Sequence, residues 1–192
     1  MKIGLISDIH GNEAGLRRAL DLMGDVDELL CMGDCVSGFS FSNEVVATLK
    51  AREALVVQGN HDADYLRWVA HKPSQEGKAD PELVDWLRNQ PERRDIDMAG
   101  KRFVMVHSTP WSRDYVWPQT PEVKRFAEID ADFVLGGHTH TPFSGRFGRA
   151  LAINPGSAGE WRFSRQNPER NLTCMILDPA SDEIETLSFP EI

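Results

Sequence analysis

Short apolar segments alternate with segments of helical periodicity through the first two thirds of the chain. Residues 2–7, 28–32 and 54–57 are apolar runs of strand length. Each run precedes apolar residues at helical spacing, and Asn12 and Ser42 stand where the first two helices would be capped. This order predicts three successive βα units, with the helices covering a sheet.

The rest of the chain has a different pattern. Asp80-Pro81 and Thr120-Pro121 each predict the start of a helix, over residues 80–87 and 120–127. A hairpin is expected from strands at 95–98 and 103–106 that turn around Ala99-Gly100. Further strands are expected, and we interpret them as a second, more antiparallel sheet formed by residues 132–135, 150–154, 171–177 and 183–187.

The composition is that of a globular protein. Hydrophobic residues make up 41% and charged residues 27% of the 192 residues, which excludes a disordered chain, collagen and a coiled coil. The length predicts one domain over residues 1–192. A formal net charge of −9 disfavours indiscriminate binding to nucleic acids or anionic membranes, although a local phosphate site is compatible with it.

Targeting signals and cysteine usage point to the cytoplasm. The sequence has no signal-peptide core and no apolar run near the roughly 20 residues of a membrane span, so neither secretion nor membrane insertion is predicted. Its cysteines, Cys31, Cys35 and Cys174, are odd in number, which favours reduced structural thiols. Half of a zinc site is the alternative for Cys31 and Cys35, but no second Cys or His pair has suitable spacing.

Histidines gather at the ends of the expected strands. Only His71 departs from this placement, and we expect a structural role for it; the others are His10, His61, His107, His138 and His140. Asp8, Asp34 and Asn60 follow the first three strands in the same way. Since the carboxyl ends of strands in an open α/β sheet line its ligand crevice, these side chains are predicted to converge on one site.

The spacing of these residues favours metal binding. Asp8-Ile9-His10 and His138-Thr139-His140 place two ligands at i and i+2, where an extended backbone would point both to one side. Each motif alone also fits a helix cap or a turn. Together the oxygen and nitrogen ligands exceed the needs of one ion, and two divalent cations that share a carboxylate would use them all.

Five motifs occur in a fixed order: Ser7-Asp8-Ile9-His10-Gly11-Asn12, Gly33-Asp34, Gly59-Asn60-His61-Asp62, Val106-His107-Ser108 and Gly137-His138-Thr139-His140. As a set they resemble the calcineurin-like metallophosphoesterase superfamily, and the later Asn154-Pro155-Gly156-Ser157 is similar to its small prokaryotic phosphodiesterase branch. The resemblance implies a four-layer α/β/β/α sandwich of two mixed β-sheets flanked by helices, with metals at the strand ends. It also implies a phosphoric ester hydrolase.

The same resemblance implies a role for each residue. One metal would be held by Asp8, His10 and His140, the other by Asn60, His107 and His138, with Asp34 bridging. A metal-bridging hydroxide would attack phosphorus, His61 would act on the leaving-group side, and Asp62 would orient His61. The donor set favours Mn²⁺, while Fe, Ni²⁺ and Zn²⁺ fit the same ligands.

One departure from the family bears on the substrate. Protein phosphatases and symmetrical dinucleoside tetraphosphatases of the family carry an Arg after the bridging Asp, whereas this chain continues Cys35-Val36-Ser37-Gly38-Phe39. We therefore expect hydrolysis of phosphodiester bonds in small or nucleotide substrates. The missing Arg would bind the two charged oxygens of a monoester phosphate, a role called the clamp below. The alternative is a phosphomonoesterase or protein phosphatase, in which the clamp comes from Arg113, Arg146, Arg149, Arg162 or Arg165.

Two further alternatives stay open on the sequence alone. The aromatics of segment 108–120, which are Trp111, Tyr115 and Trp117, would either stack a base or anchor their loop. A non-catalytic metal-binding scaffold of the same fold is less favoured, because every ligand position and His61 are intact. The sequence makes no prediction of oligomeric state.

Overall fold

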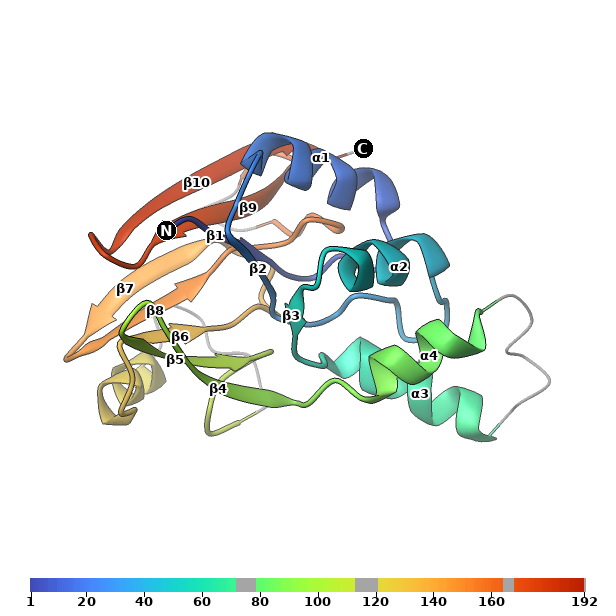
Figure 1. Ribbon diagram of the computed structural model, residues 1–192, viewed down its shortest axis with the longest axis horizontal. Helices are drawn as coiled ribbons and strands as arrows, with labels where there is room; N and C mark the ends of the chain where they lie inside the picture. Colours follow the sequence, from blue (N-terminus) through green and yellow to red (C-terminus); the bar gives the residue numbers. More distant parts are fainter. Residues whose placement is uncertain (72–78, 113–120, 164–167, 192) are drawn as a thin grey trace.

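Two mixed five-stranded sheets, packed face to face, form the centre of the structure (Figure 1). The computed structural model describes residues 1–71, 79–112, 121–163 and 168–191. Its elements in chain order are β1 (Ile3–Ile6), α1 (Glu13–Met23), β2 (Glu28–Cys31), α2 (Asn43–Ala51), β3 (Leu55–Val56), α3 (Asn60–His71), α4 (Pro81–Arg88), β4 (Arg93–Met98), β5 (Lys101–Val106), the 3₁₀ helix η2 (Pro121–Glu128), β6 (Phe133–Leu135), β7 (Phe143–Phe147), β8 (Ala150–Asn154), β9 (Asn171–Asp178) and β10 (Glu183–Pro190).

The first sheet contains the predicted βα units. Its strand order is β10-β9-β1-β2-β3, and β1, β2 and β3 run parallel. The predicted caps are confirmed: the Asn12 side chain accepts the Gly15 N–H, and the Ser42 side chain accepts the Val45 N–H. The carboxyl ends of β1 to β3 therefore meet at one edge.

The second sheet brings three more parallel strands to the same region. Its order is β4-β5-β6-β8-β7, in which β5, β6 and β8 run parallel. The predicted hairpin is confirmed but begins earlier, at Arg93, and turns at Ala99 and Gly100, which both have positive φ. Strand β7 was not predicted, because its alternately half-buried and exposed residues carry a weak hydrophobic signal. The expected helix from Thr120 is the 3₁₀ helix η2, and Thr120 itself lies outside the described residues.

The assignment of residues 171–177 and 183–187 to the second sheet is wrong. Both β9 and β10 belong to the first sheet, where β9 pairs antiparallel with β1 through Ile3 and Leu177. The physical reason is that β9 is buried on both of its faces. Leu177 packs between the sheets, whereas Cys174 packs in the apolar cluster beneath α1, with its Sγ 3.8 Å from the carbonyl of Ala19.

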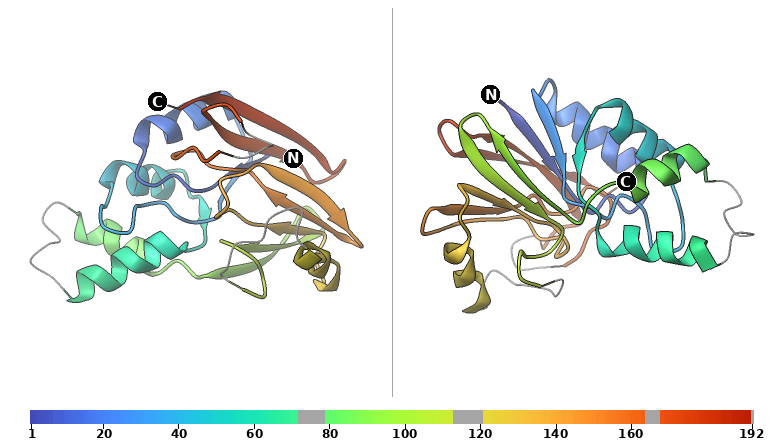
Figure 2. Two further views of the ribbon diagram at one scale, coloured as in Figure 1. Left: turned by 180° about the vertical axis from the view of Figure 1, so that it is seen from behind. Right: turned by 60° about the horizontal axis from the view of Figure 1, so that its bottom comes forward.

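Three apolar clusters separate four layers, which confirms the expected sandwich. One cluster lies between the first sheet and α1 to α4, one between the two sheets, and one between the second sheet and η2. Figure 2 shows the sheets stacked, with most of the helices on the outer side of the first. Phe103 and Phe133 stack at the centre of the middle cluster, with ring centroids 4.7 Å apart.

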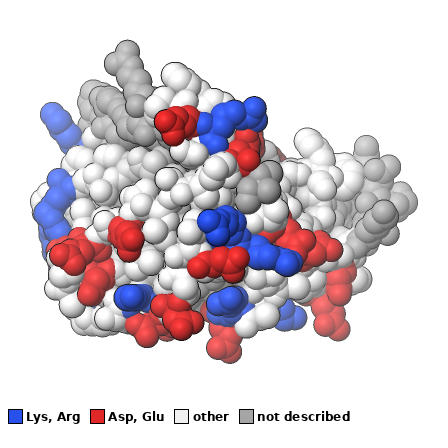
Figure 3. All heavy atoms as spheres, turned by 90° about the horizontal axis from the view of Figure 1, so that it is seen from above, with Lys and Arg blue, Asp and Glu red and all other residues white. Residues whose placement is uncertain are grey.

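The molecular surface carries mixed charge. On the face shown in Figure 3, acidic and basic side chains are intermingled. Among the described residues, the helices are all too short or too polar to traverse a lipid bilayer.

Candidate metal centre

The seven predicted ligands lie on loops at the carboxyl ends of strands from both sheets. Asp8 follows β1, Asp34 follows β2, and Asn60 begins α3 just after β3. His107 directly follows β5, and the pair His138 and His140 follows β6. The sandwich therefore joins ligands that are up to 132 positions apart in the sequence, from Asp8 to His140.

The extended backbone predicted for the two i, i+2 motifs is wrong. Asp8 and His10 have φ of 53° and 50°, and His138 and His140 have φ of 68° and 55°. Asp34 has a φ of 52°. Five of the eight non-glycine residues with positive φ in the described part of the chain are therefore predicted ligands. Such a conformation costs about 1–3 kcal/mol per residue and is typical of functional sites.

Hydrogen bonds between neighbouring loops hold this conformation. The N–H of Asp8 donates to the carbonyl of Gly33 at 3.0 Å, and the N–H of His10 donates to that of Asp34 at 2.9 Å. The loop after β1 is thus fastened to the loop after β2 through the ligand residues themselves. Within the first motif, the side chains of Asp8 and His10 lie together as expected, by a different backbone route. In the second motif, His138 and His140 belong to different ligand groups.

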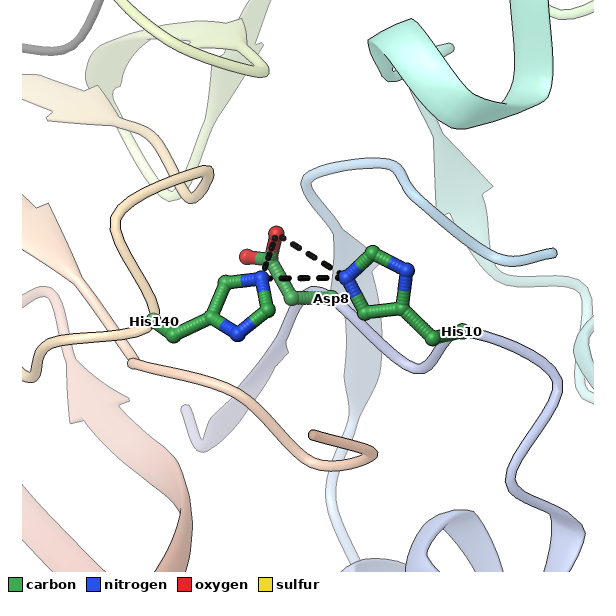
Figure 4. A group of neighbouring side chains, drawn as sticks. All are labelled: Asp8, His10 and His140. Atoms are coloured by element: carbon green, nitrogen blue, oxygen red, sulfur yellow. Dashed lines mark hydrogen bonds and ion pairs between the residues drawn. The ribbon is translucent and has the colours of Figure 1, made fainter. Parts of the chain in front are cut away.

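Asp8, His10 and His140 form the first ligand group (Figure 4). The Nε2 atoms of His10 and His140 are 3.0 Å apart. Oδ1 of Asp8 lies 3.3 Å from Nε2 of His140 and 3.8 Å from Nε2 of His10. Three donor atoms therefore face a common point.

The protonation of this group leaves lone pairs at that point. The His140 Nδ1–H donates to the carbonyl of Glu160 at 2.8 Å, which leaves Nε2 as the basic nitrogen of the neutral ring. Burial lowers the pKa of His10 below its ordinary value. Burial opposes ionisation of Asp8, but the imidazoles of His140, His107 and His10 outweigh it and hold its pKa below the usual range.

An orphaned atom provides a direct test of whether the group fits a cation. Asp8 Oδ1 is buried and accepts no hydrogen bond. A buried carboxylate oxygen without a partner costs about 1–3 kcal/mol or more, and a cation between it and two imidazole nitrogens would satisfy all three. The residues present therefore fit a divalent metal ion.

The second group consists of Asp34, Asn60, His107 and His138. Nε2 of His107 lies 3.2 Å from Asp34 Oδ2, 3.1 Å from Asn60 Oδ1 and 3.2 Å from His138 Nδ1. The His107 Nδ1–H donates to the carbonyl of Met32 at 2.6 Å, which directs Nε2 into the group.

Electrostatics in the second group also favour a positive charge. Burial opposes the charged form of His107, but the Asp34 carboxylate outweighs it and raises the pKa of His107 to about 9. Burial and the nearby His107 lower the pKa of His138 to about 4. The Asp34 carboxylate, 3.2 Å from Nε2 of His107, therefore favours a positive charge at this point.

Asp34 lies between the two groups. Its Oδ2 is 3.9 Å from Nε2 of His10 and 3.2 Å from Nε2 of His107. Its Oδ1 accepts the backbone N–H of His61 at 2.8 Å. One carboxylate therefore faces both groups, as the bridging role would require.

His61 and Asp62 occupy different environments. The His61 Nδ1 accepts the N–H of Gly38 at 3.1 Å, so the ring proton is on Nε2, and the ring stands at 88° to that of His10 with centroids 4.7 Å apart. Asp62 is buried, and its oxygens accept the N–H groups of Val36 and Gly59 at 3.1 and 2.9 Å. The carboxylate joins the loops that carry Val36 and Gly59, and among the described residues it accepts no hydrogen bond from the His61 ring.

Burial and the charge of Asp34 raise the pKa of Asp62 to about 7, although the N–H groups of Gly59 and Val36 oppose the shift.

Sequence reasoning missed Glu160. Its Oε2 lies 3.8 Å from Nε2 of His10, and its backbone carbonyl accepts the hydrogen bond from the His140 Nδ1–H. Ser157 Oγ fixes this segment, because it donates to the carbonyl of Asp8 at 2.7 Å and accepts the Glu160 N–H at 2.8 Å. In the sequence, the pointer to Glu160 is its position just after the Asn154 to Ser157 motif and next to Gly159. In the structure, Gly159 permits a close approach of the two loops, because a Cβ there would lie 1.7 Å from the Ile9 carbonyl oxygen.

The arginines considered as a phosphate clamp differ in their distance from the ligand groups. Arg146 pairs with Asp182, and Arg149 with Asp130 and Asp132, in exposed ion pairs. Arg162 lies close enough to His138 for its charge to contribute to the lowered pKa of that residue. The remaining candidates, Arg113 and Arg165, lie outside the described residues.

A cavity adjoins the second ligand group. It has a volume of about 300 Å³ and is lined in part by Asn60, His107, Arg93 and Trp111. Trp111 also packs edge-on against Phe126 at 4.9 Å, and the Arg125 guanidinium lies 4.6 Å from its ring centre. These contacts favour the anchoring role for Trp111, while Tyr115 and Trp117 lie outside the described residues.

Comparison with known proteins identifies the family of this chain. The family model of the calcineurin-like phosphoesterase superfamily domain matches residues 1–182. A symmetrical bis(5'-nucleosyl)-tetraphosphatase of Paracidovorax citrulli is 31% identical over 149 residues, which cover 68% of this chain and 53% of the relative. One of Delftia acidovorans is 30% identical over 147 residues, covering 64% and 50%. The chain thus spans about half the length of these curated relatives.

Among solved structures, a metallophosphoesterase of Sphaerobacter thermophilus has the same fold. Its TM-score is 0.82 at 22% identity, and the match covers 100% of this chain and 90% of that one. The family uses divalent metal ions, for which the ligand groups around Asp34 are suited. The chain belongs to the calcineurin-like phosphoesterase superfamily.

Proposed function

We propose that the chain is a dinuclear-metal phosphoesterase that hydrolyses phosphodiester bonds in small or nucleotide substrates. The observation that carries this proposal is the position of Asp34, whose Oδ2 faces His10 of one ligand group and His107 of the other. A carboxylate shared by two groups is the arrangement that two divalent ions about 3.5 to 4 Å apart require.

In this proposal Asp8, His10 and His140 hold one ion, and Asn60, His107 and His138 hold the other. When bound, such a pair supplies charge neutralisation at phosphorus and lowers the pKa of water toward about 7. The chain's own contribution is orientation. The Glu160 and Met32 carbonyls each fix the tautomer of one ligand histidine, and the left-handed turns at Asp8 and His10 bring these two side chains to the first ion.

His61 would supply the proton for the leaving group. While Nδ1 accepts the Gly38 N–H, the neutral ring would offer its Nε2–H as a hydrogen bond to the leaving-group oxygen. Proton transfer would require the imidazolium form, in which Nδ1 carries a hydrogen and the Gly38 bond is broken. Asp62 acts as a positioning residue, since it binds the N–H groups of Val36 and Gly59 on the two loops that flank His61.

A nucleotide or another small phosphodiester is the proposed substrate. The curated relatives are named for hydrolysis of a dinucleoside tetraphosphate, and the cavity of about 300 Å³ beside Asn60 and His107 suits a small molecule. The loop after Asp34, which ends at Phe39, lacks the arginine that related phosphatases carry there. The site is therefore without the side chain that would bind both charged oxygens of a phosphate monoester.

Other parts of the proposal follow from composition and contacts. We assign residues 1–192 to a single domain and favour Mn²⁺ for a site of carboxylate, imidazole and amide donors. The buried free thiols of Cys31, Cys35 and Cys174 suit a reducing cytoplasm.

Turnover of matched aryl esters tests the proposal. We expect Mn²⁺-dependent hydrolysis, with a higher kcat/KM for a bis-aryl phosphate than for the corresponding aryl monophosphate. A monoester preference of about tenfold or more, equivalent to about 1.4 kcal/mol, would favour the phosphomonoesterase alternative and a clamp from Arg162. Metal binding without any turnover would favour the scaffold alternative.

A further inference from the structure

The loop after Asp34 forms a tight turn at the rim of the metal centre. Ser37 and Ser40 form an isolated β-bridge, in which each N–H donates to the carbonyl of the other, at 3.2 and 3.3 Å. Gly38 and Phe39 are left at the tip of this turn. Their backbone position is therefore fixed by hydrogen bonds on both sides.

The turn lies directly against His61. The Gly38 N–H donates to His61 Nδ1 at 3.1 Å, and a Cβ at Gly38 would be 3.4 Å from the same atom. His61 in turn contacts the His10 ring. The residue that follows Gly38 is consequently placed beside the edge of the site where His61 stands.

That residue, Phe39, is 75% exposed. Its ring stands edge-on to Trp68 of α3, at 86° with centroids 6.2 Å apart, and this is its one ring contact within the described residues. Trp68 contacts the buried Tyr65, which also packs against Phe41. A rigid aromatic base thus supports a phenyl ring that is mostly open to solvent.

We propose that Phe39 stacks on a planar group of the substrate, a nucleobase or an aryl ring, attached to the side of the phosphate that faces His61. This inference rests on the proposed function, which supplies the substrate that the ring would bind. Sequence-independent stacking of bases on aromatic side chains is a common device for binding nucleotides. An exposed phenyl ring on the turn whose Gly38 N–H contacts His61 would select nucleotide esters over alkyl esters.

Binding of two related probes to the Mn²⁺-loaded chain tests this inference. We would measure the Kd of AMP and of ribose 5-phosphate by calorimetry for the wild type, Phe39→Ala and Phe39→Trp. The wild type is expected to prefer AMP, and Phe39→Ala to weaken AMP binding about 5- to 50-fold with ribose 5-phosphate unchanged. Phe39→Trp is expected to keep the preference.

Phe163→Ala is the matched control, since Phe163 is 68% exposed and has Trp161 as an edge-on neighbour. The inference is overturned by a wild type without AMP preference, by equal loss of both probes in Phe39→Ala, or by the same loss in Phe163→Ala. Because binding needs no turnover, failure of the proposed function would be seen separately, as an absence of bis-aryl phosphate hydrolysis with the AMP preference retained.

Discussion

Asp34 Oδ2 lies 3.2 Å from Nε2 of His107, and the two residues come from loops of different sheets. The contact joins the half of the site built on β1 to β3 to the half built on β5, β6 and β8. Any cation bound between Asp34 and His107 therefore also couples the two sheets.

Asp34→Asn tests this coupling. The amide has one carbonyl oxygen in place of two carboxylate oxygens, so we expect it to lose the bridge while His61 keeps a partner for its N–H. Bound metal should fall to one ion per chain or fewer, with a loss of several orders of magnitude in turnover. Elemental analysis that found two tightly bound ions in an active variant would contradict the two-metal assignment. Asp64→Asn, on the exposed side of α3, serves as the control.

Asn60 and His61 are adjacent, but their substitution should change different quantities: the metal requirement for Asn60 and kcat for His61. Asn60→Ala removes an oxygen 3.1 Å from His107 Nε2, so we expect a higher metal concentration to be needed for activity. His61→Ala should lower kcat with metal content nearly unchanged. It should also harm alkyl esters more than activated aryl esters, which need little protonation of the leaving group. Equal loss on both ester types would argue against His61 as the acid.

Asp62→Asn should destabilise the fold. The buried carboxylate accepts two backbone N–H groups, and an amide accepts only on its oxygen, which leaves one buried donor unsatisfied. We expect the free energy of unfolding to fall by about 1–3 kcal/mol in urea denaturation of the metal-free chain. Asp64→Asn, which breaks an exposed pair with Arg67, should change it by less than about 1 kcal/mol. Similar effects in both variants would show that the two N–H bonds contribute little.

The cysteines should resist alkylation in the folded chain. All three are buried, and burial raises the pKa of Cys174 to about 12, which leaves almost no thiolate at pH 8. Mass spectrometry after brief iodoacetamide treatment should find unmodified native protein and full modification in urea. Rapid labelling of Cys174 in the native chain would contradict its placement beneath α1.

Much of the site was predictable because its polar residues interrupt apolar strands. Asp8, Asp34 and His107 each follow a hydrophobic run, and parallel strand ends converge whatever the details of packing. The partner of β9 was not predictable, since its pairing with β1 joins residues such as Ile3 and Leu177 that no local pattern connects. Glu160 was missed for a similar reason: its carboxylate approaches His10 through a tertiary contact.

The left-handed backbone was also beyond sequence reasoning. Aspartate adopts this conformation more readily than most residues, but Asp8 and Asp34 do so here because hydrogen bonds between loops hold them, and those loops meet only in the folded chain.

The left-handed ligands have a consequence for substitution. At His138, for example, glycine would suit the backbone better than the histidine that the proposed metal site requires. Exchange of such a ligand for glycine would relieve local strain, which offsets the greater freedom that glycine gives the unfolded chain. In the proposed site, His138→Gly would therefore give up one metal ligand and keep its backbone turn, so removal of a ligand need not disrupt the loop that carries it.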